Sequence, residues 1–212
     1  MQHSRWAIRV VGIAAFFAIL SVGSAALAQS VIRNPGQHPD YVAELEPHLA
    51  IGPFDPPGDS IGTGFGAGLR ATIPIVKNGF VSTINNSVGI TFGLDYLHYW
   101  GGDIAIGPCS YWVPGPNNTR ICTHVAGPTS GPSNYVFLPI ALQWNFWLHE
   151  QFSVFGEPGF VIYHRKAEFE PSGNVGLAPM LDVGGRWHFS KVASLTFRFG
   201  YPTFALGVSF FL

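Results

Sequence analysis

The sequence predicts an all-β protein, an eight-stranded antiparallel up-and-down transmembrane β-barrel with an N-terminal signal peptide. Three observations predict this fold. Charged residues make up 11% of the 212-residue chain, less than half of the roughly 25% that is typical of soluble domains. Eight segments alternate in polarity with a period of two, as strands do. An apolar stretch with the pattern of an export signal precedes them.

Composition excludes several other classes. Aromatic residues reach 15% of the chain, which also contains 26 Gly and 17 Pro. A helical membrane bundle would need several runs of about 20 apolar residues, and a disordered chain would have few aromatics and a high net charge. The formal charge of -1 provides no general attraction for phosphates, so we expect no nucleic-acid partner.

The N-terminus predicts export. Arg5 and Arg9 precede an apolar run over 10–22, and Ala26-Leu27-Ala28 follows it. This is the pattern of a secretory signal peptide, residues 1–28, with cleavage after Ala28. A retained membrane anchor is the alternative, although the run is shorter than the ~20 residues that a spanning helix needs. The mature chain would begin with a short leader over 29–40 and continue as the barrel over 41–212.

The strands are expected over 41–51, 62–75, 88–99, 135–147, 152–163, 176–189, 194–200 and 203–212. An even number of antiparallel strands can close into a barrel, which removes the exposed sheet edges. Short connections over 149–151 and 190–193 alternate with longer ones over 52–61, 100–134 and 164–175. Two connections depart from this alternation. The connection 76–87 is long although it falls where a short turn is expected, and 201–202 is short although it falls where a long loop is expected.

Charge placement indicates which face of the barrel meets lipid. Of the eight charged residues within the strands, seven or eight fall on the face opposite the more apolar one, with Glu157 the least clear. A transmembrane barrel has an apolar exterior and a polar interior, whereas a soluble, lipocalin-like barrel, which is the alternative, has the reverse. Five acids and three arginines can pair across a narrow lumen, and left unpaired they would cost several kcal/mol each. The expected lumen network is Glu44, Glu46, Arg70, Asp95, Glu157, Asp182, Arg186 and Arg198.

Aromatic residues near the strand ends predict two belts at the membrane interfaces, where such rings are favoured. One belt would contain Tyr96, Tyr99, Trp100, Tyr135, Tyr163 and Tyr201. The other would contain Trp144, Phe146, Trp147, Trp187, Phe189 and Phe210.

The two cysteines of the chain, Cys109 and Cys122, lie thirteen residues apart in the segment 100–134, which is dense in Pro, Gly, Asn and Ser. Export would place them in an oxidising compartment, so we expect a disulfide that staples this long loop. A metal site with His124 as a third ligand is the alternative, but a fourth ligand at a recognisable spacing is missing. We therefore expect no metal and no cofactor.

The chain resembles the small bacterial outer-membrane β-barrels of the OmpA/OmpX-like kind. The resemblance rests on the signal with Ala26-Leu27-Ala28, the eight alternating segments and the terminal strand FALGVSFFL. It implies a bacterial outer-membrane location, a periplasmic leader over 29–40, external loops and contact with outer-membrane lipids. It also implies that the barrel-assembly machinery reads the last strand; members usually end in Phe, whereas this chain ends in Leu. The assembly signal would be formed by Phe204, Leu206, Val208, Phe210 and Leu212.

Three functions are compatible with such a barrel, because a fold does not define an activity. The leading one is a non-enzymatic structural or surface-interaction role, with the loop 100–134 as contact surface for an extracellular ligand. A narrow channel for small solutes or ions is the second, although eight strands enclose a lumen that side chains can fill. An outer-membrane lipid-modifying enzyme is the third; it would rely on His48 with Glu46, or on His98 or His164, but no catalytic triad order is present.

Overall fold

The structure is a computed structural model, and it describes residues 30–58, 60, 62–101, 109–125, 132–167 and 173–212. The predicted signal peptide, residues 1–28, lies outside the described residues. Within the described part of the chain, no helix is both long enough and apolar enough to cross a membrane.

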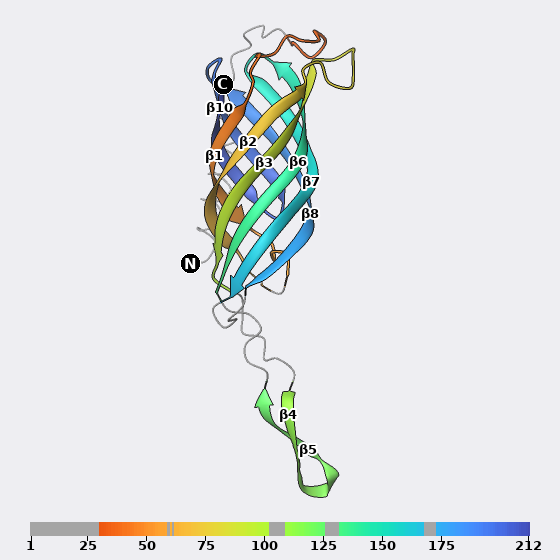
Figure 1. The fold of residues 1–212 in the computed structure, drawn as a ribbon, viewed down its shortest axis with the longest axis vertical. Helices are drawn as coiled ribbons and strands as arrows, with labels where there is room; N and C mark the ends of the chain where they lie inside the picture. The colour runs from red at the N-terminus through yellow and green to blue at the C-terminus, as the bar shows by residue number, and fades with distance from the viewer. Residues whose placement is uncertain (1–29, 59, 61, 102–108, 126–131, 168–172) are drawn as a thin grey trace, which may run out of the picture.

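Eight antiparallel strands form one closed barrel, which confirms the predicted fold class (Figure 1). The order around the barrel is β1-β10-β9-β8-β7-β6-β3-β2, so that the first and last strands close it. The strands are β1 (Glu44–Gly52), β2 (Gly64–Val76), β3 (Asn86–Tyr99), β6 (Ser133–His149), β7 (Phe152–Ala167), β8 (Asn174–His188), β9 (Ala193–Tyr201) and β10 (Phe204–Phe211). Their ends coincide with the predicted ones or differ from them by up to four residues.

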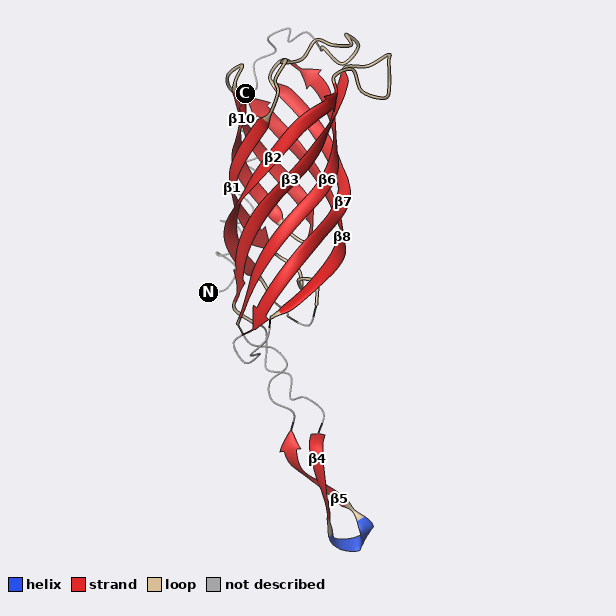
Figure 2. Cartoon of the chain, in the orientation of Figure 1, coloured by secondary structure: helices blue, strands red, loops and turns tan. Residues whose placement is uncertain are grey.

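The two remaining strands were not predicted. β4 (Cys109–Pro114) and β5 (Arg120–Val125) pair as a separate two-stranded hairpin, with the short 3-10 turn η1 (Pro116–Asn118) at its tip. Figure 2 shows this hairpin projecting beyond one end of the barrel. The segment is rich in Pro, Gly and Asn, which predict turns, so its two short runs of β-forming residues were not recognised as strands. At the tip, Asn117 has a φ of 56°, a left-handed conformation that asparagine tolerates better than most residues.

The barrel has two different ends. We call the end that carries both chain termini of the barrel and the turns 77–85, 150–151 and 189–192 the terminus end. We call the end that carries the connections 53–63, 100–132, 168–173 and 202–203 the loop end. The turn 77–85 is longer than the other two because it binds the leader: the Asn85 backbone N–H donates to the Ile32 carbonyl, and its side chain donates to the Gln37 carbonyl, both at 2.7 Å.

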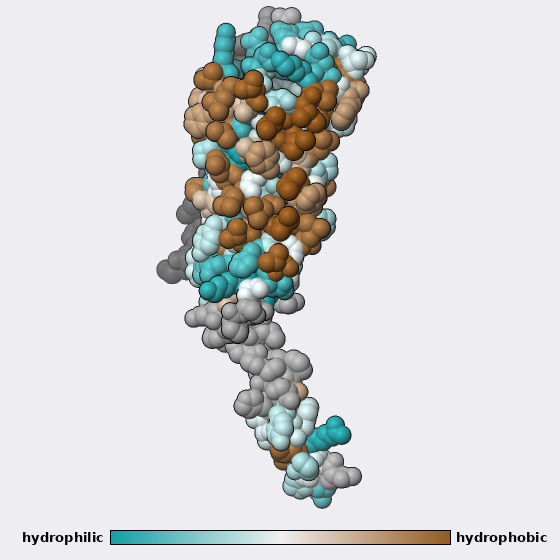
Figure 3. All heavy atoms as spheres, in the orientation of Figure 1, coloured by the Kyte–Doolittle hydropathy of each residue, from teal (hydrophilic) through white to brown (hydrophobic). Residues whose placement is uncertain are grey.

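The outer wall of the barrel is apolar. Along β10, for example, Leu206 and Phe210 are 52% and 43% exposed, whereas their neighbours Ala205 and Phe211 are buried. Figure 3 shows the resulting apolar band over the barrel, with hydrophilic residues gathered at its ends. This distribution is the reverse of that in a soluble barrel and is the one that a lipid environment requires.

The predicted aromatic belts are partly wrong. Tyr99 and Tyr135 are fully buried in the lumen near the loop end. Trp147, near the terminus end, is only 2% exposed. Tyr163 and Tyr201 pack partly buried against the inner cluster. Nearness to a strand end predicted a belt position, but alternate residues of a strand point to opposite faces right up to its end. The exposed belt members on the outer wall include Tyr96, Trp100, Trp187, Phe189 and Phe210.

Candidate functional site

The lumen is occupied by charge. The structure places all eight charged residues of the expected network inside the barrel, each at most 2% exposed. Glu157, whose face was least clear from sequence, points inward together with Phe155 and Val161. Charges buried to this degree must be paired, because an isolated ion in such surroundings is costly.

Arg198 lies at the centre of the largest ion-pair cluster. Its guanidinium donates to Glu46 through Nη1 and to Glu157 through Nε, at 2.9 Å, and Nη2, at 3.3 Å. Each of the two carboxylates accepts a further hydrogen bond. Ser209 Oγ donates to Glu46 Oε2 at 2.9 Å, and Gln143 Nε2 donates to Glu157 Oε1 at 2.6 Å. One arginine thus ties β9 to β1 and β7 across the lumen.

Arg186 forms a second cluster nearer the terminus end. Its Nη2 donates to both oxygens of Glu44 at 2.8 and 2.9 Å, and its Nη1 donates to Asn145 Oδ1 at 2.6 Å. The guanidinium also lies 4.2 Å above the centre of the Phe155 ring, a favourable cation–π contact. Every charged group in this cluster has a direct partner.

Arg70 forms a third cluster toward the loop end. Its Nη2 donates to Asp95 Oδ2 at 2.8 Å, and the other Asp95 oxygen lies 3.0 Å from His48 Nε2. Asp182 forms a weaker ion pair with Arg70 than Asp95 does, because its Oδ2 lies 3.9 Å from Arg70 Nη1, too far for a hydrogen bond. Asp182 Oδ1 has no hydrogen-bond partner among the described residues.

An aromatic layer closes the lumen at the loop end. Tyr135 packs edge-on against Tyr99 and stacks on Phe137, with ring centres 5.1 and 5.2 Å apart. Its hydroxyl donates to the carbonyl of Pro57 at 3.0 Å, which ties the β1–β2 connection over this layer. The three rings have no exposed surface, so side chains fill the barrel cross-section at this level.

The leader closes the opposite end. Val31 is buried with Tyr41, Trp147 and Phe211, and its N–H donates to the Leu148 carbonyl at 3.1 Å. The Lys77 ammonium lies 2.6 Å from Asp40 Oδ1 and lowers the pKa of that carboxyl. Sequence analysis missed this plug. One signal of it was present, because Phe211 is the one bulky residue that interrupts the small side chains on the inward face of the last strand.

The hairpin staple is formed as predicted. Cys109 and Cys122 are joined by a disulfide with a Cα–Cα distance of 5.8 Å, so neither is available as a metal ligand. Among the described residues, no three His, Cys, Asp or Glu side chains gather in an arrangement that could hold a metal ion.

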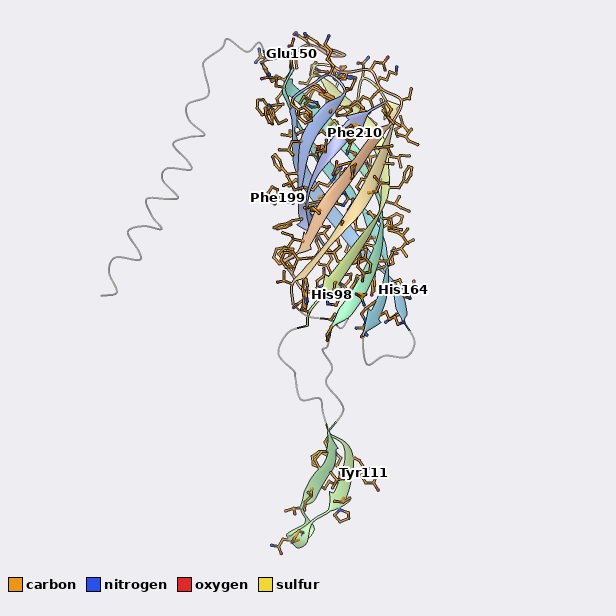
Figure 4. All side chains as sticks on the ribbon, turned by 90° about the vertical axis from the view of Figure 1, so that its left-hand side faces the viewer. His98, Tyr111, Glu150, His164, Phe199 and Phe210 are labelled. Atoms are coloured by element: carbon orange, nitrogen blue, oxygen red, sulfur yellow. A yellow bond between two sulfur atoms is a disulfide. The ribbon has the colours of Figure 1, made fainter. Side chains whose placement is uncertain are left out.

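The histidines of the enzyme hypothesis are not brought together. His48 is buried against Asp95 inside the lumen. The His98 Nδ1–H donates to Asn134 Oδ1 at 2.9 Å, and both His98 and His164 lie at the loop end (Figure 4).

The residues of the expected assembly signal lie on the last strand. Leu206, Phe210 and Leu212 are exposed on the outer wall, whereas Phe204 and Val208 are half-buried. At the chain end, the Leu212 N–H donates to the Ala43 carbonyl at 2.9 Å, and the Val42 N–H donates to the Leu212 carbonyl at 2.7 Å.

An apolar outer wall, a lumen of paired charges and closure by strands define a transmembrane β-barrel. Two comparisons by sequence find no relative: no protein-family model matches the chain, and no curated protein does.

The chain is similar in structure to small outer-membrane proteins. Ail, the attachment invasion locus protein of Yersinia pestis, solved with the heparin analogue sucrose octasulfate, matches with a TM-score of 0.47 and 9% identity, over 79% of this chain and 96% of that one. The same outer membrane protein in a phospholipid bilayer nanodisc matches with a TM-score of 0.45 and 12% sequence identity, over 82% of this chain and 100% of that one. Neisserial surface protein A matches with a TM-score of 0.40 and 12% sequence identity, over 81% of this chain and 96% of that one.

Proposed function

We propose that the chain is a non-enzymatic, exported outer-membrane protein whose closed barrel anchors an external contact surface. In this proposal residues 1–28 are removed, residues 29–40 lie in the periplasm, and the assembly machinery reads the last strand. The contact surface is the hairpin of β4 and β5. The observation that carries the proposal is the exposure of large apolar side chains on this hairpin, outside the lipid-facing wall.

The hairpin has the properties of a binding surface. Tyr111, Trp112 and Ile121 are 64%, 52% and 47% exposed. An isolated two-stranded hairpin is marginally stable in water, and the disulfide compensates for the missing second layer. The hairpin carries one arginine, Arg120, and no acidic residue. Exposed Trp, Tyr and Arg are the residue types that dominate binding energy at interfaces.

Replacing both hairpin aromatics, Tyr111→Ser with Trp112→Ser, is expected to weaken ligand binding by about 30-fold, because truncating such anchors costs ~2 kcal/mol or more. Binding of vesicle-embedded protein to immobilised glycosaminoglycans and matrix proteins measures this. Leu177→Ser, which alters a similarly exposed apolar residue on the barrel wall, is the control for nonspecific hydrophobic binding. Unchanged binding by the double variant, with heat-modifiable gel mobility intact, would contradict the proposal.

The same protein in planar bilayers is expected to show no conductance steps. The three ion-pair clusters, the aromatic layer at Tyr135 and the plug at Trp147 fill the lumen at successive levels. Single-channel recording, with a large porin as positive control, tests this. Reproducible steps from pure folded protein would favour the channel hypothesis instead.

A lipid-modifying enzyme receives less support. Its best candidate pair, His48 with Glu46, is buried inside the lumen and faces away from lipid. An altered lipid profile after overexpression would restore that hypothesis.

A further inference from the structure

A groove crosses the outer wall of the barrel over β6, β7, β8 and β9. Its volume is about 490 Å³, and its lining is apolar. The lining residues include Phe146, Val154, Gly156, Val183, Phe197 and Phe199. Figure 4 places Phe199 on this outer wall, between the two ends of the barrel.

Gly156 shapes the hollow. Among the glycines of the barrel strands, all of which the structure describes, only Gly156 and Gly185 share a face with the exposed apolar residues. Gly156 lies opposite Val183, and Gly185 lies opposite Val154, so the two are diagonal neighbours across the β7–β8 pair. A Cβ atom at Gly156 would meet nothing within 4 Å, whereas one at Gly185 would lie 2.7 Å from the Phe197 ring, which covers that position. The wall is therefore recessed where side chains elsewhere stand out.

The groove lies at the depth of acyl chains. Lys191, in the turn between β8 and β9, is six residues from Gly185. At about 3.3 Å per residue and a strand tilt of roughly 40°, Gly185 lies about 15 Å inside the level of this turn. The apolar band of such barrels is about 25 Å tall, so the groove is surrounded by hydrocarbon, and lipid tails are the medium in contact with it.

Polar groups suited to a phospholipid headgroup lie at the terminus end of the same strands. Lys191 is exposed in the β8–β9 turn, and Glu150 is exposed in the β6–β7 turn. Both turns lie next to the groove strands, and both residues also border a pocket of about 640 Å³ at the mouth of the barrel, whose lining includes Trp147, His188 and His38. One cation and one anion complement a zwitterionic headgroup, which carries a phosphate and an ammonium.

We propose that this outer wall binds one zwitterionic phospholipid of the leaflet at the terminus end. An acyl chain lies in the groove over Gly156, the headgroup phosphate contacts Lys191, and the headgroup ammonium contacts Glu150. This goes beyond the proposed contact role of the hairpin, which lies at the opposite end of the barrel.

Native mass spectrometry tests the proposal on the full chain, reconstituted in a mixture of phosphatidylethanolamine and phosphatidylglycerol and released in mild detergent. We expect one retained phosphatidylethanolamine per wild-type chain. Gly156→Leu should reduce the retained fraction at least tenfold, since the new side chain fills the groove without a clash at Cβ. The matched control, Ala67→Leu, places the same leucine side chain on the outer wall at β2, away from the groove, and should retain the lipid.

Headgroup variants separate the two polar contacts. Lys191→Gln should lower the retention of phosphatidylethanolamine severalfold, whereas Glu150→Gln should remove the preference for phosphatidylethanolamine over phosphatidylglycerol. No lipid on the wild-type protein, or equal retention by Gly156→Leu, would overturn the proposal. So would a wild-type dimer without lipid that Gly156→Leu converts to monomers, since a second copy would then occupy the groove. The hairpin variants should leave retention unchanged, so a failure of the proposed function is distinguishable from a failure here.

Discussion

Arg198→Met is expected to destabilise the folded barrel by about 3–5 kcal/mol, because it leaves the buried carboxylates of Glu46 and Glu157 without their cation. Arg198 ties three strands together across the lumen, so its loss should lower the resistance of the whole barrel to unfolding. Urea unfolding in lipid vesicles, followed by tryptophan fluorescence, measures the change in the free energy of unfolding.

Two controls isolate the charge effect. Arg120→Met removes an exposed arginine from the hairpin and should change barrel stability by less than about 0.5 kcal/mol. Adding Glu46→Gln and Glu157→Gln to Arg198→Met should recover most of the loss, since replacing all members of a buried ion cluster is often nearly neutral. If Arg198→Met alone costs less than about 1 kcal/mol, the cluster does not hold the strands together in the manner described.

Trp147→Ala is expected to cost about 3–5 kcal/mol, the usual range for truncating a buried tryptophan. The ring stacks on His38 of the leader and packs against His188, with centres 5.5 and 5.1 Å apart, and its Nε1 donates to Ser87 Oγ at 3.3 Å. Its removal should also release the leader, which limited proteolysis near residues 30–40 would detect as new cleavage. The same vesicle unfolding assay reports the loss of stability.

Trp187→Ala is the matched control, because Trp187 is 46% exposed on the outer wall near the same end. It should destabilise the barrel less and leave the leader protected. Equal effects of the two substitutions on proteolysis would show that the leader does not depend on the Trp147 plug.

Alternation along each strand was sufficient to predict the barrel and the facing of most side chains. In 204–212 the burial alternates with the predicted period through to Leu212, and the disulfide of Cys109 with Cys122 followed from spacing and export. These features are local, since a period of two needs no knowledge of neighbouring strands.

The partner of each charge could not be read from the chain. Arg186 meets Glu44 and Arg198 meets Glu46 across 142 and 152 residues, because strand stagger and barrel closure set which inward residues share a level. The same holds for the leader plug at Val31 and for the groove at Gly156, which arises only when β6, β7, β8 and β9 lie side by side. Periodicity assigns a residue to a face of its strand; its neighbours around and across the barrel depend on how the strands are staggered when the barrel closes.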